Sequence, residues 1–230
     1  MTEGVRLYDL RGEQTDPAPK SRIDWRGRTI HRDPKKITGV TIHQTAVSFG
    51  VTSRMIAEAG GDERLALARR GLKVPAHVEA FRDGTVAATD DVTAYLNHAG
   101  RLNAASAAEE IDGRYSGLLD RPETAPREDL RTTWGSADPQ RFEGLIVDAS
   151  RTGLVWIVTE LRRMGAPVRY VWAHRQSSST RRADPGEGIW RGLVLDFAVP
   201  YLGLATQPGR TWGKGRPIPR QWDPDGVGDY

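Results

Sequence analysis

The chain of 230 residues contains no cysteine and only three methionines. The absence of cysteine excludes disulfide bonds, cysteine-ligated zinc, iron–sulfur clusters and a thiol nucleophile. The chain also has no apolar run near the ~18 residues of a membrane-spanning helix, and its polar N-terminus does not read as a secretion signal. We therefore expect a protein that is made in the cytoplasm, does not insert into a membrane, and acts outside that cell only after lysis or export by another route.

A strong charge of one sign is also lacking. The formal net charge is +3, and the basic and acidic residues are interspersed along the chain. A nucleic-acid-binding domain would show a basic patch with aromatic stacking residues, so a nucleic-acid partner is not expected. The small positive excess suits an anionic polymer such as cell wall or nucleic acid, although many proteins without such a partner carry as much charge.

The length predicts one domain with extensions, because a typical domain has roughly 150 residues. Residues 1–36 are polar and contain turn signals at Asp16-Pro17 and Asp33-Pro34, so we expect an N-terminal arm laid over the domain. The domain itself is expected to span residues 37–205. The Gly- and Pro-rich residues 206–230 are expected to form an irregular tail.

The hydrophobic patterns predict strands and helices in mixed order. Strands are predicted at residues 37–43, 76–81, 85–88, 107–112 and 168–174, with a hairpin turn at Asp83-Gly84. Helices are predicted at residues 52–72 (interrupted at Gly60-Gly61), 139–164 (starting at Asp138-Pro139) and 189–202. This order predicts an α/β (α+β) fold, a single domain with a central mixed β-sheet flanked by helices.

Two histidines stand at the C-terminal ends of predicted strands, where such a fold presents side chains to a cleft. They are His43 and His174, and Asp184 follows His174 by ten residues along a polar loop. Two imidazoles and one carboxylate form a three-ligand set for catalytic zinc that leaves a fourth position for water. The spacing alone equally allows hydrogen-bonded structural histidines.

Four short sequence motifs occur in a specific order over about residues 25–200. They are Ile42-His43-Gln44-Thr45-Ala46, His77…Phe81-Arg82-Asp83-Gly84-Thr85-Val86, Asn97-His98-Ala99-Gly100 and His174…Asp184-Pro185-Gly186. Together they resemble the zinc-dependent N-acetylmuramoyl-L-alanine amidase family. This family is related to phage lysozyme-type amidases, cytosolic anhydro-muropeptide amidases and animal peptidoglycan recognition proteins.

The resemblance implies a peptidoglycan hydrolase that cleaves the amide bond between N-acetylmuramic acid and L-alanine of the stem peptide. His43, His174 and Asp184 match the three ligands of one zinc ion per chain. Arg182 falls where many members carry a lysine that stabilises the oxyanion, and an arginine there keeps the charge but changes its donor geometry. The expected partner is peptidoglycan, and the protein is expected to be a monomer.

The resemblance also implies a general base on the strand after Asn103…Ser106, where Glu110 matches the family's carboxylate. Phage lysozyme-type members use a tyrosine just before the hairpin histidine, but this chain has Ala76 there. Glu109 remains the alternative, because a shift of one residue exchanges the two faces of a strand. His77 and His98 match positions that line the substrate groove, although hydrogen-bonded structural roles are equally compatible with them.

A second interpretation within the same fold is a peptidoglycan-binding module that no longer cleaves. Such relatives typically lose a zinc ligand, whereas all three ligand types are present here. Three settings fit an amidase without a signal: a phage endolysin released at lysis, an effector delivered into a rival cell, and a cytosolic recycling enzyme. The arm and the tail exceed a minimal domain and favour the first two.

Overall fold

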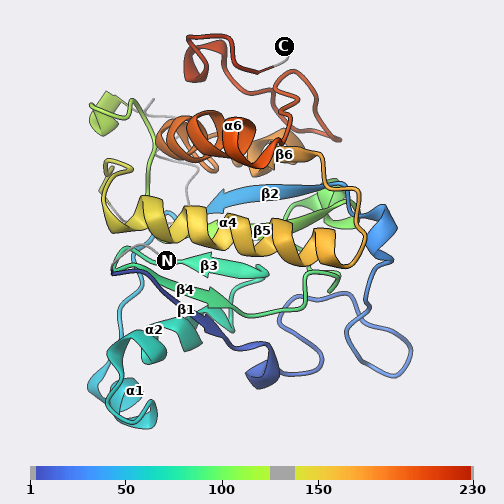
Figure 1. Ribbon diagram of the computed structural model, residues 1–230, viewed down its shortest axis with the longest axis vertical. Helices are drawn as coiled ribbons and strands as arrows, with labels where there is room; N and C mark the ends of the chain where they lie inside the picture. Colours follow the sequence, from blue (N-terminus) through green and yellow to red (C-terminus); the bar gives the residue numbers. More distant parts are fainter. Residues whose placement is uncertain (1–3, 125–137, 229–230) are drawn as a thin grey trace.

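The computed structural model describes residues 4–124 and 138–228. Within these ranges a mixed six-stranded sheet lies at the centre, with the strand order β1-β4-β3-β5-β2-β6 (Figure 1). Neighbouring strands run parallel except β3 and β4, which are antiparallel. The strands are β1 Arg6–Asp9, β2 Gly39–Gln44, β3 Val78–Ala80, β4 Thr85–Ala88, β5 Ser106–Ile111 and β6 Tyr170–Ala173.

The predicted fold class is confirmed, and each predicted strand is present. The sequence analysis missed β1, because it expected order to begin only at residue 37. Strand β1 is a short edge strand with Arg6 and Asp9 exposed, so it lacks a clear alternating pattern. Its two middle residues hold it in place, because Leu7 packs against the main core and Tyr8 against a smaller cluster near α2. The division of the chain at residues 36 and 205 stays a prediction.

The helices occupy the predicted regions with one change of boundary. They are α1 Ser53–Glu58, α2 Glu63–Gly71, α4 Leu145–Arg163, α5 Glu187–Ile189, a π-helical segment Trp190–Ala198 and α6 Val199–Leu202. The predicted start of α4 at Pro139 is wrong. Tertiary contacts keep the preceding residues out of the helix, since the backbone N–H of Gln140 donates to Arg114 O (2.8 Å) and Phe142 packs edge-on against Tyr115.

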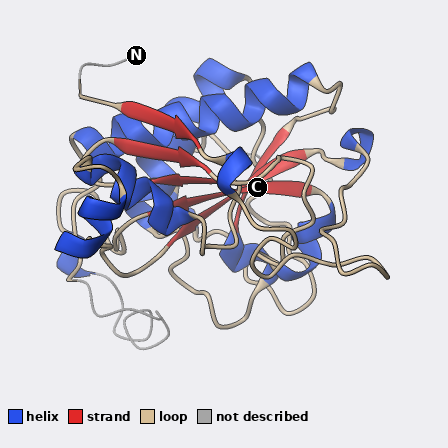
Figure 2. Cartoon of the chain, turned by 90° about the horizontal axis from the view of Figure 1, so that it is seen from below, coloured by secondary structure: helices blue, strands red, loops and turns tan. Residues whose placement is uncertain are grey.

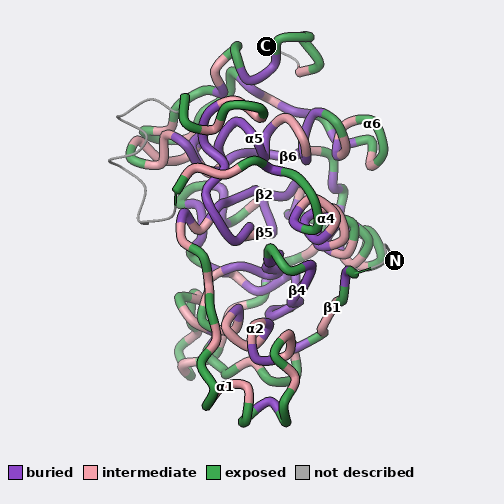
Figure 3. The backbone as a smooth tube through the Cα atoms, turned by 90° about the vertical axis from the view of Figure 1, so that its left-hand side faces the viewer, coloured by how far each residue is buried: buried purple, intermediate pink, exposed green. Residues whose placement is uncertain are grey.

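The two faces of the sheet are covered by different elements. Helix α4 covers one face and packs against β3, β4 and β5, while α2 packs against β3 and β4 on the other face and loops cover the rest of that face (Figure 2). The buried chain is concentrated in the strands and in the helices packed on them (Figure 3). Side chains alternate along each strand, so Ile42 and Val78 join the core below α4 while His43 lies on the loop-covered face.

The N-terminal arm is tied to the loop-covered face through Arg32, which is 8% exposed. Its guanidinium donates to four backbone carbonyl oxygens, those of Val92, Thr93, Asn103 and Ser106, at 2.5–3.1 Å. Burial lowers the pKa of Arg32 to about 10. The arm therefore fixes the segment that leads into β5.

Short 3-10 helices complete the described secondary structure. They are Arg11–Glu13, Pro34–Lys36, Gly100–Ala104, Pro122–Thr124, His174–Ser177 and Arg220–Trp222. None of the helices in the described part of the chain has the length and apolar character required to cross a membrane. Residues 206–228 contain no helix or strand apart from the 3-10 turn Arg220–Trp222.

Candidate metal centre

Two histidines meet at the carboxyl ends of neighbouring strands. His43 is the penultimate residue of β2 and His174 directly follows β6. These strands are parallel, and Ile42 of β2 lies opposite Ala173 of β6. The residue that follows each of these two is one of the histidines, so the histidines lie side by side. Their Nδ1 atoms lie 3.0 Å apart.

Asp184 completes the cluster from the loop after His174. Its Oδ2 lies 3.0 Å from Nδ1 of His174, and the three residues offer ligand atoms that all lie within 4.8 Å of one another. The other carboxyl oxygen, Oδ1, accepts the backbone N–H of Gln44 at 3.1 Å. The side-chain amide of Gln44 also donates to Ala183 O. The structure therefore brings the three predicted ligands together and anchors their loop to the strand that carries His43.

Burial favours the neutral form of the histidine at the centre. His43 is 2% exposed, and burial lowers its pKa well below the ordinary value, with smaller contributions from the nearby rings of His174 and His98. A metal ligand must be a neutral imidazole with a free lone pair. Two such nitrogens and a carboxylate are the donor set of a catalytic zinc site, so the residues fit this metal.

A pocket of about 260 Å³ lies over this cluster. Its polar lining includes Lys20 and Arg181, and its apolar lining includes Phe49, Val74 and Pro75. The sequence analysis did not identify Lys20 or Gln44 as site residues. Gln44 could have been noticed as the direct neighbour of His43, whereas Lys20 lies in the arm and carries no local signal.

The two adjacent glutamates of β5 point to opposite faces of the sheet. Glu110 is opposite His43 in the register with β2, and it lines the pocket. Glu109 is opposite Ile42 and lies beneath Gly153 of α4. Only Glu110 therefore has the placement expected of a general base.

Opposing influences act on the pKa of the Glu110 carboxyl group. Burial raises its pKa well above the ordinary value, and the nearby carboxylate of Asp184 raises it further. Arg181 and Lys20 act in the opposite direction. Such opposing influences are typical of groups that exchange a proton during a reaction.

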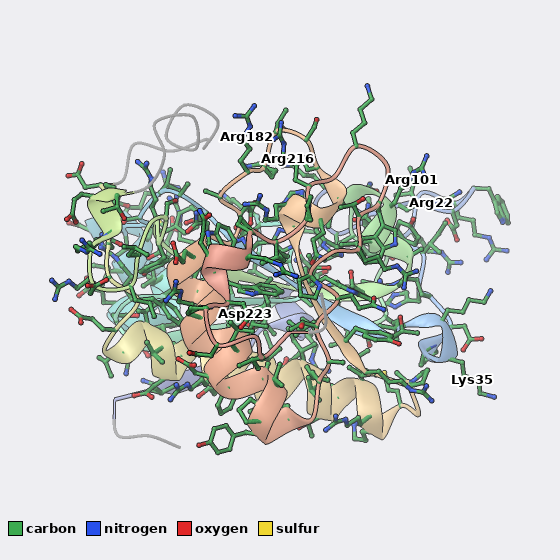
Figure 4. All side chains as sticks on the ribbon, turned by 90° about the horizontal axis from the view of Figure 1, so that it is seen from above. Arg22, Lys35, Arg101, Arg182, Arg216 and Asp223 are labelled. Carbon is green, nitrogen blue, oxygen red and sulfur yellow. The ribbon has the colours of Figure 1, made fainter. Side chains whose placement is uncertain are left out.

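Arg181, rather than the predicted Arg182, lines the pocket of the metal cluster. Arg182 lines a second pocket, together with Arg175 and Arg216. Figure 4 shows Arg182 and Arg216 beside each other at the edge of the molecule. The placement does not support the oxyanion role predicted for Arg182, because Arg182 lines this second pocket and not the pocket over the metal cluster.

His77 does not line the pocket over the metal cluster, and it has the hydrogen-bonded structural placement that the sequence left open as the alternative. It is fully buried, its Nδ1 accepts the backbone N–H of Ala108 at 2.9 Å, and its Nε2 donates to Ala94 O at 3.0 Å. Burial and the neighbouring Arg32 lower the pKa of His77 to about 3. His77 is therefore a neutral structural residue that joins β5 to the segment before His98.

His98 does line the pocket, but mainly as a neighbour of a metal ligand. Its Nδ1 lies 3.1 Å from Nε2 of His43, and its Nε2 lies 3.3 Å from Ser106 O. Burial lowers the pKa of His98 well below the ordinary value, with smaller contributions from His77 and Arg32. Both ring nitrogens thus face protein partners.

Comparison with known proteins finds no matching family model and no matching curated protein. Solved structures do match. Wild-type PGRP-LB of Drosophila shares 14% sequence identity over 87% of this chain and 96% of that chain, with a TM-score of 0.48. The endolysin N-acetylmuramoyl-L-alanine amidase LysCS of Clostridium intestinale shares 14% identity over 80% of this chain and 88% of that chain, with a TM-score of 0.39.

A further match is the Ph2119 endolysin of the Thermus scotoductus bacteriophage Ph2119. It shares 16% identity over 79% of this chain and 92% of that chain, with a TM-score of 0.39. The chain thus shows similarity both to peptidoglycan recognition proteins and to amidase endolysins.

Proposed function

We propose that this protein is a zinc-dependent N-acetylmuramoyl-L-alanine amidase. It hydrolyses the amide bond between the lactyl group of muramic acid and the first L-alanine of the stem peptide. The observation that carries this proposal is the convergence of His43, His174 and Asp184 beside the carboxyl group of Glu110 in one pocket. The order of the four sequence motifs, which resembles that of the amidase family, supports the choice of peptidoglycan as the substrate.

The three ligands would hold zinc through the two Nδ1 atoms and the carboxylate of Asp184. When bound there, zinc supplies a Lewis acid that polarises the scissile carbonyl and lowers the pKa of a water towards ~7. The hydrogen bond from the backbone N–H of Gln44 to Oδ1 of Asp184 holds this carboxylate in the orientation of a ligand.

The chain's own residues move the proton and stabilise charge. Glu110 accepts a proton from the attacking water and then delivers it to the leaving amine of L-alanine. Arg181 places a positive charge in the same pocket, where it stabilises the negative charge that develops on the carbonyl oxygen. The carbon–nitrogen bond breaks and a carbon–oxygen bond forms, so that a lactyl carboxylate and a free stem peptide result.

Digestion of purified sacculi tests this proposal. Mass spectrometry should show stem peptides with a free L-alanine amine, together with glycan strands that keep their lactyl carboxylates. Chelation of zinc should abolish the release, and added zinc should restore it. Asp184→Ala should lose both zinc binding and turnover, and full activity of this variant would remove the metal centre from the mechanism.

The two adjacent glutamates provide a matched pair of variants. Glu110→Gln should keep zinc and lose about 10²–10⁴-fold in kcat, which is the usual contribution of a general acid–base. Glu109→Gln should keep its activity, because Glu109 faces the opposite side of the sheet. Loss of activity in Glu109→Gln alone would contradict the assignment.

The same experiment separates this function from that of a non-catalytic peptidoglycan-binding module. Such a module would bind sacculi without releasing peptides, with or without zinc.

A further inference from the structure

We propose that His98 is a positioning residue that fixes the tautomer and orientation of His43, so that the Nδ1 lone pair of His43 faces the metal position. This inference rests on the proposed metal centre, although its central claim concerns the metal-free protein as well. Metal-bound histidines generally donate their second ring N–H to a carboxylate, a carbonyl or a water. Here the acceptor is a second, neutral imidazole.

The direction of this hydrogen-bond chain is set at its far end. A backbone carbonyl oxygen can only accept, so the 3.3 Å contact between Ser106 O and Nε2 of His98 places the single proton of the neutral His98 ring on Nε2. Nδ1 of His98 is then an acceptor. The 3.1 Å contact with this atom places the proton of His43 on Nε2.

The consequence appears at the other side of the His43 ring. Because Nε2 carries the proton, Nδ1 of His43 has a free lone pair, and this is the atom that lies 3.0 Å from Nδ1 of His174. The opposite tautomer would direct an N–H at the metal position. It would also leave the Nδ1–H of His98 facing His43 and two lone pairs facing each other at Ser106.

The terminal acceptor and the loop of His98 are both held in place. Ser106 O also accepts from the buried guanidinium of Arg32 at 2.5 Å, which limits rotation of that carbonyl. The backbone N–H of Ala99, the residue after His98, donates to Oδ1 of Asn103 at 2.5 Å. The chain from Arg32 to His43 is therefore built from groups that have little freedom to rearrange.

Two substitutions separate the two ring nitrogens of His98. In His98→Asn the amide oxygen takes the place of Nδ1 and still accepts from His43. In His98→Gln the amide reaches the place of Nε2, while a methylene group replaces Nδ1. We expect His98→Gln to weaken zinc affinity by about 10- to 100-fold, the usual effect of losing such a partner, and His98→Asn to stay close to the wild type.

Zinc affinity is measured by competition with a chromophoric chelator on the full chain. The second readout is the pair of ring nitrogen chemical shifts of His43 in the metal-free protein, which report the protonated nitrogen. We expect the Nε2–H tautomer in the wild type and in His98→Asn, and a mixture of tautomers in His98→Gln.

Equal zinc affinity of the Asn and Gln variants, or an Nδ1–H tautomer in the metal-free wild type, overturns the role of His98. If the wild type binds no zinc, the proposed function fails instead, and the tautomer of His43 still decides on His98. The wild-type measurement needs no substitution, so the inference stays testable even if a variant does not fold.

Discussion

Glu109 is a buried carboxyl group that should make the fold less stable as the pH rises. Its side chain is 0% exposed, and neither carboxyl oxygen has a hydrogen-bond partner among the residues that the structure describes. Burial raises the pKa of Glu109 well above the ordinary value of 4.5. The folded protein therefore keeps a proton that the unfolded chain releases above that pH. The contribution of Glu109 to stability is highest below pH 4.5 and decreases as the pH rises towards the folded-state pKa.

Glu109→Gln removes this titration while keeping the shape of the side chain. Each pH unit above 4.5 costs the wild type up to about 1.4 kcal/mol until the buried carboxyl ionises. Between pH 5 and pH 7 the variant should therefore gain up to about 3 kcal/mol relative to the wild type.

The measurement is urea unfolding of the metal-free proteins at both pH values, followed by tryptophan fluorescence. Glu143→Gln is the control, because Glu143 is exposed and should show no such gain. If the difference between Glu109→Gln and the wild type is the same at pH 5 and pH 7, the reasoning from burial is refuted.

Three further predictions concern residues around the site. Gly153→Ala should lower the free energy of unfolding by about 1–3 kcal/mol, because its methyl group would lie 2.6 Å from Oε1 of Glu109. This loss outweighs the gain in helix propensity of up to ~1 kcal/mol. A higher free energy of unfolding in urea for the variant would contradict this. His77→Leu should lower the same free energy by about 1–3 kcal/mol through the loss of two buried hydrogen bonds, with zinc affinity unchanged in a chelator titration. Arg181→Gln should lower kcat by about 10²–10³-fold and Arg182→Gln should not, as measured by peptide release from sacculi; the reverse result would return the oxyanion role to Arg182.

Much of the sheet could be predicted because buried strands leave a clear pattern in the sequence. Residues 37–44 alternate between the two faces, and the Asp83-Gly84 turn fixes the β3–β4 hairpin. Strand β1 could not be found in this way, since it has only four residues, two of them exposed and two half-buried, and depends on pairing with β4. The start of α4 was misplaced for a related reason. The capping signal at Asp138-Pro139 is local, whereas the contact of Phe142 with Tyr115 is not.

The candidate site shows the same division between strand and loop. His43 and Glu110 lie on strands, and the register alone places them on one face. The 181–184 segment is a loop without such alternation, so the sequence could not show which of its two arginines enters the pocket. For His77 the sequence shows a strand-edge histidine, but the backbone groups that occupy both of its nitrogens come from distant segments.

The N-terminal arm sets a limit on how this protein can be shortened or fused for engineering. A version that begins at residue 37 would discard β1 and expose the edge of β4, which offers unpaired backbone groups to other chains and invites aggregation. It would also discard Arg32 and leave four carbonyl oxygens without their shared donor. A chimera or shortened version should therefore be joined ahead of Arg6.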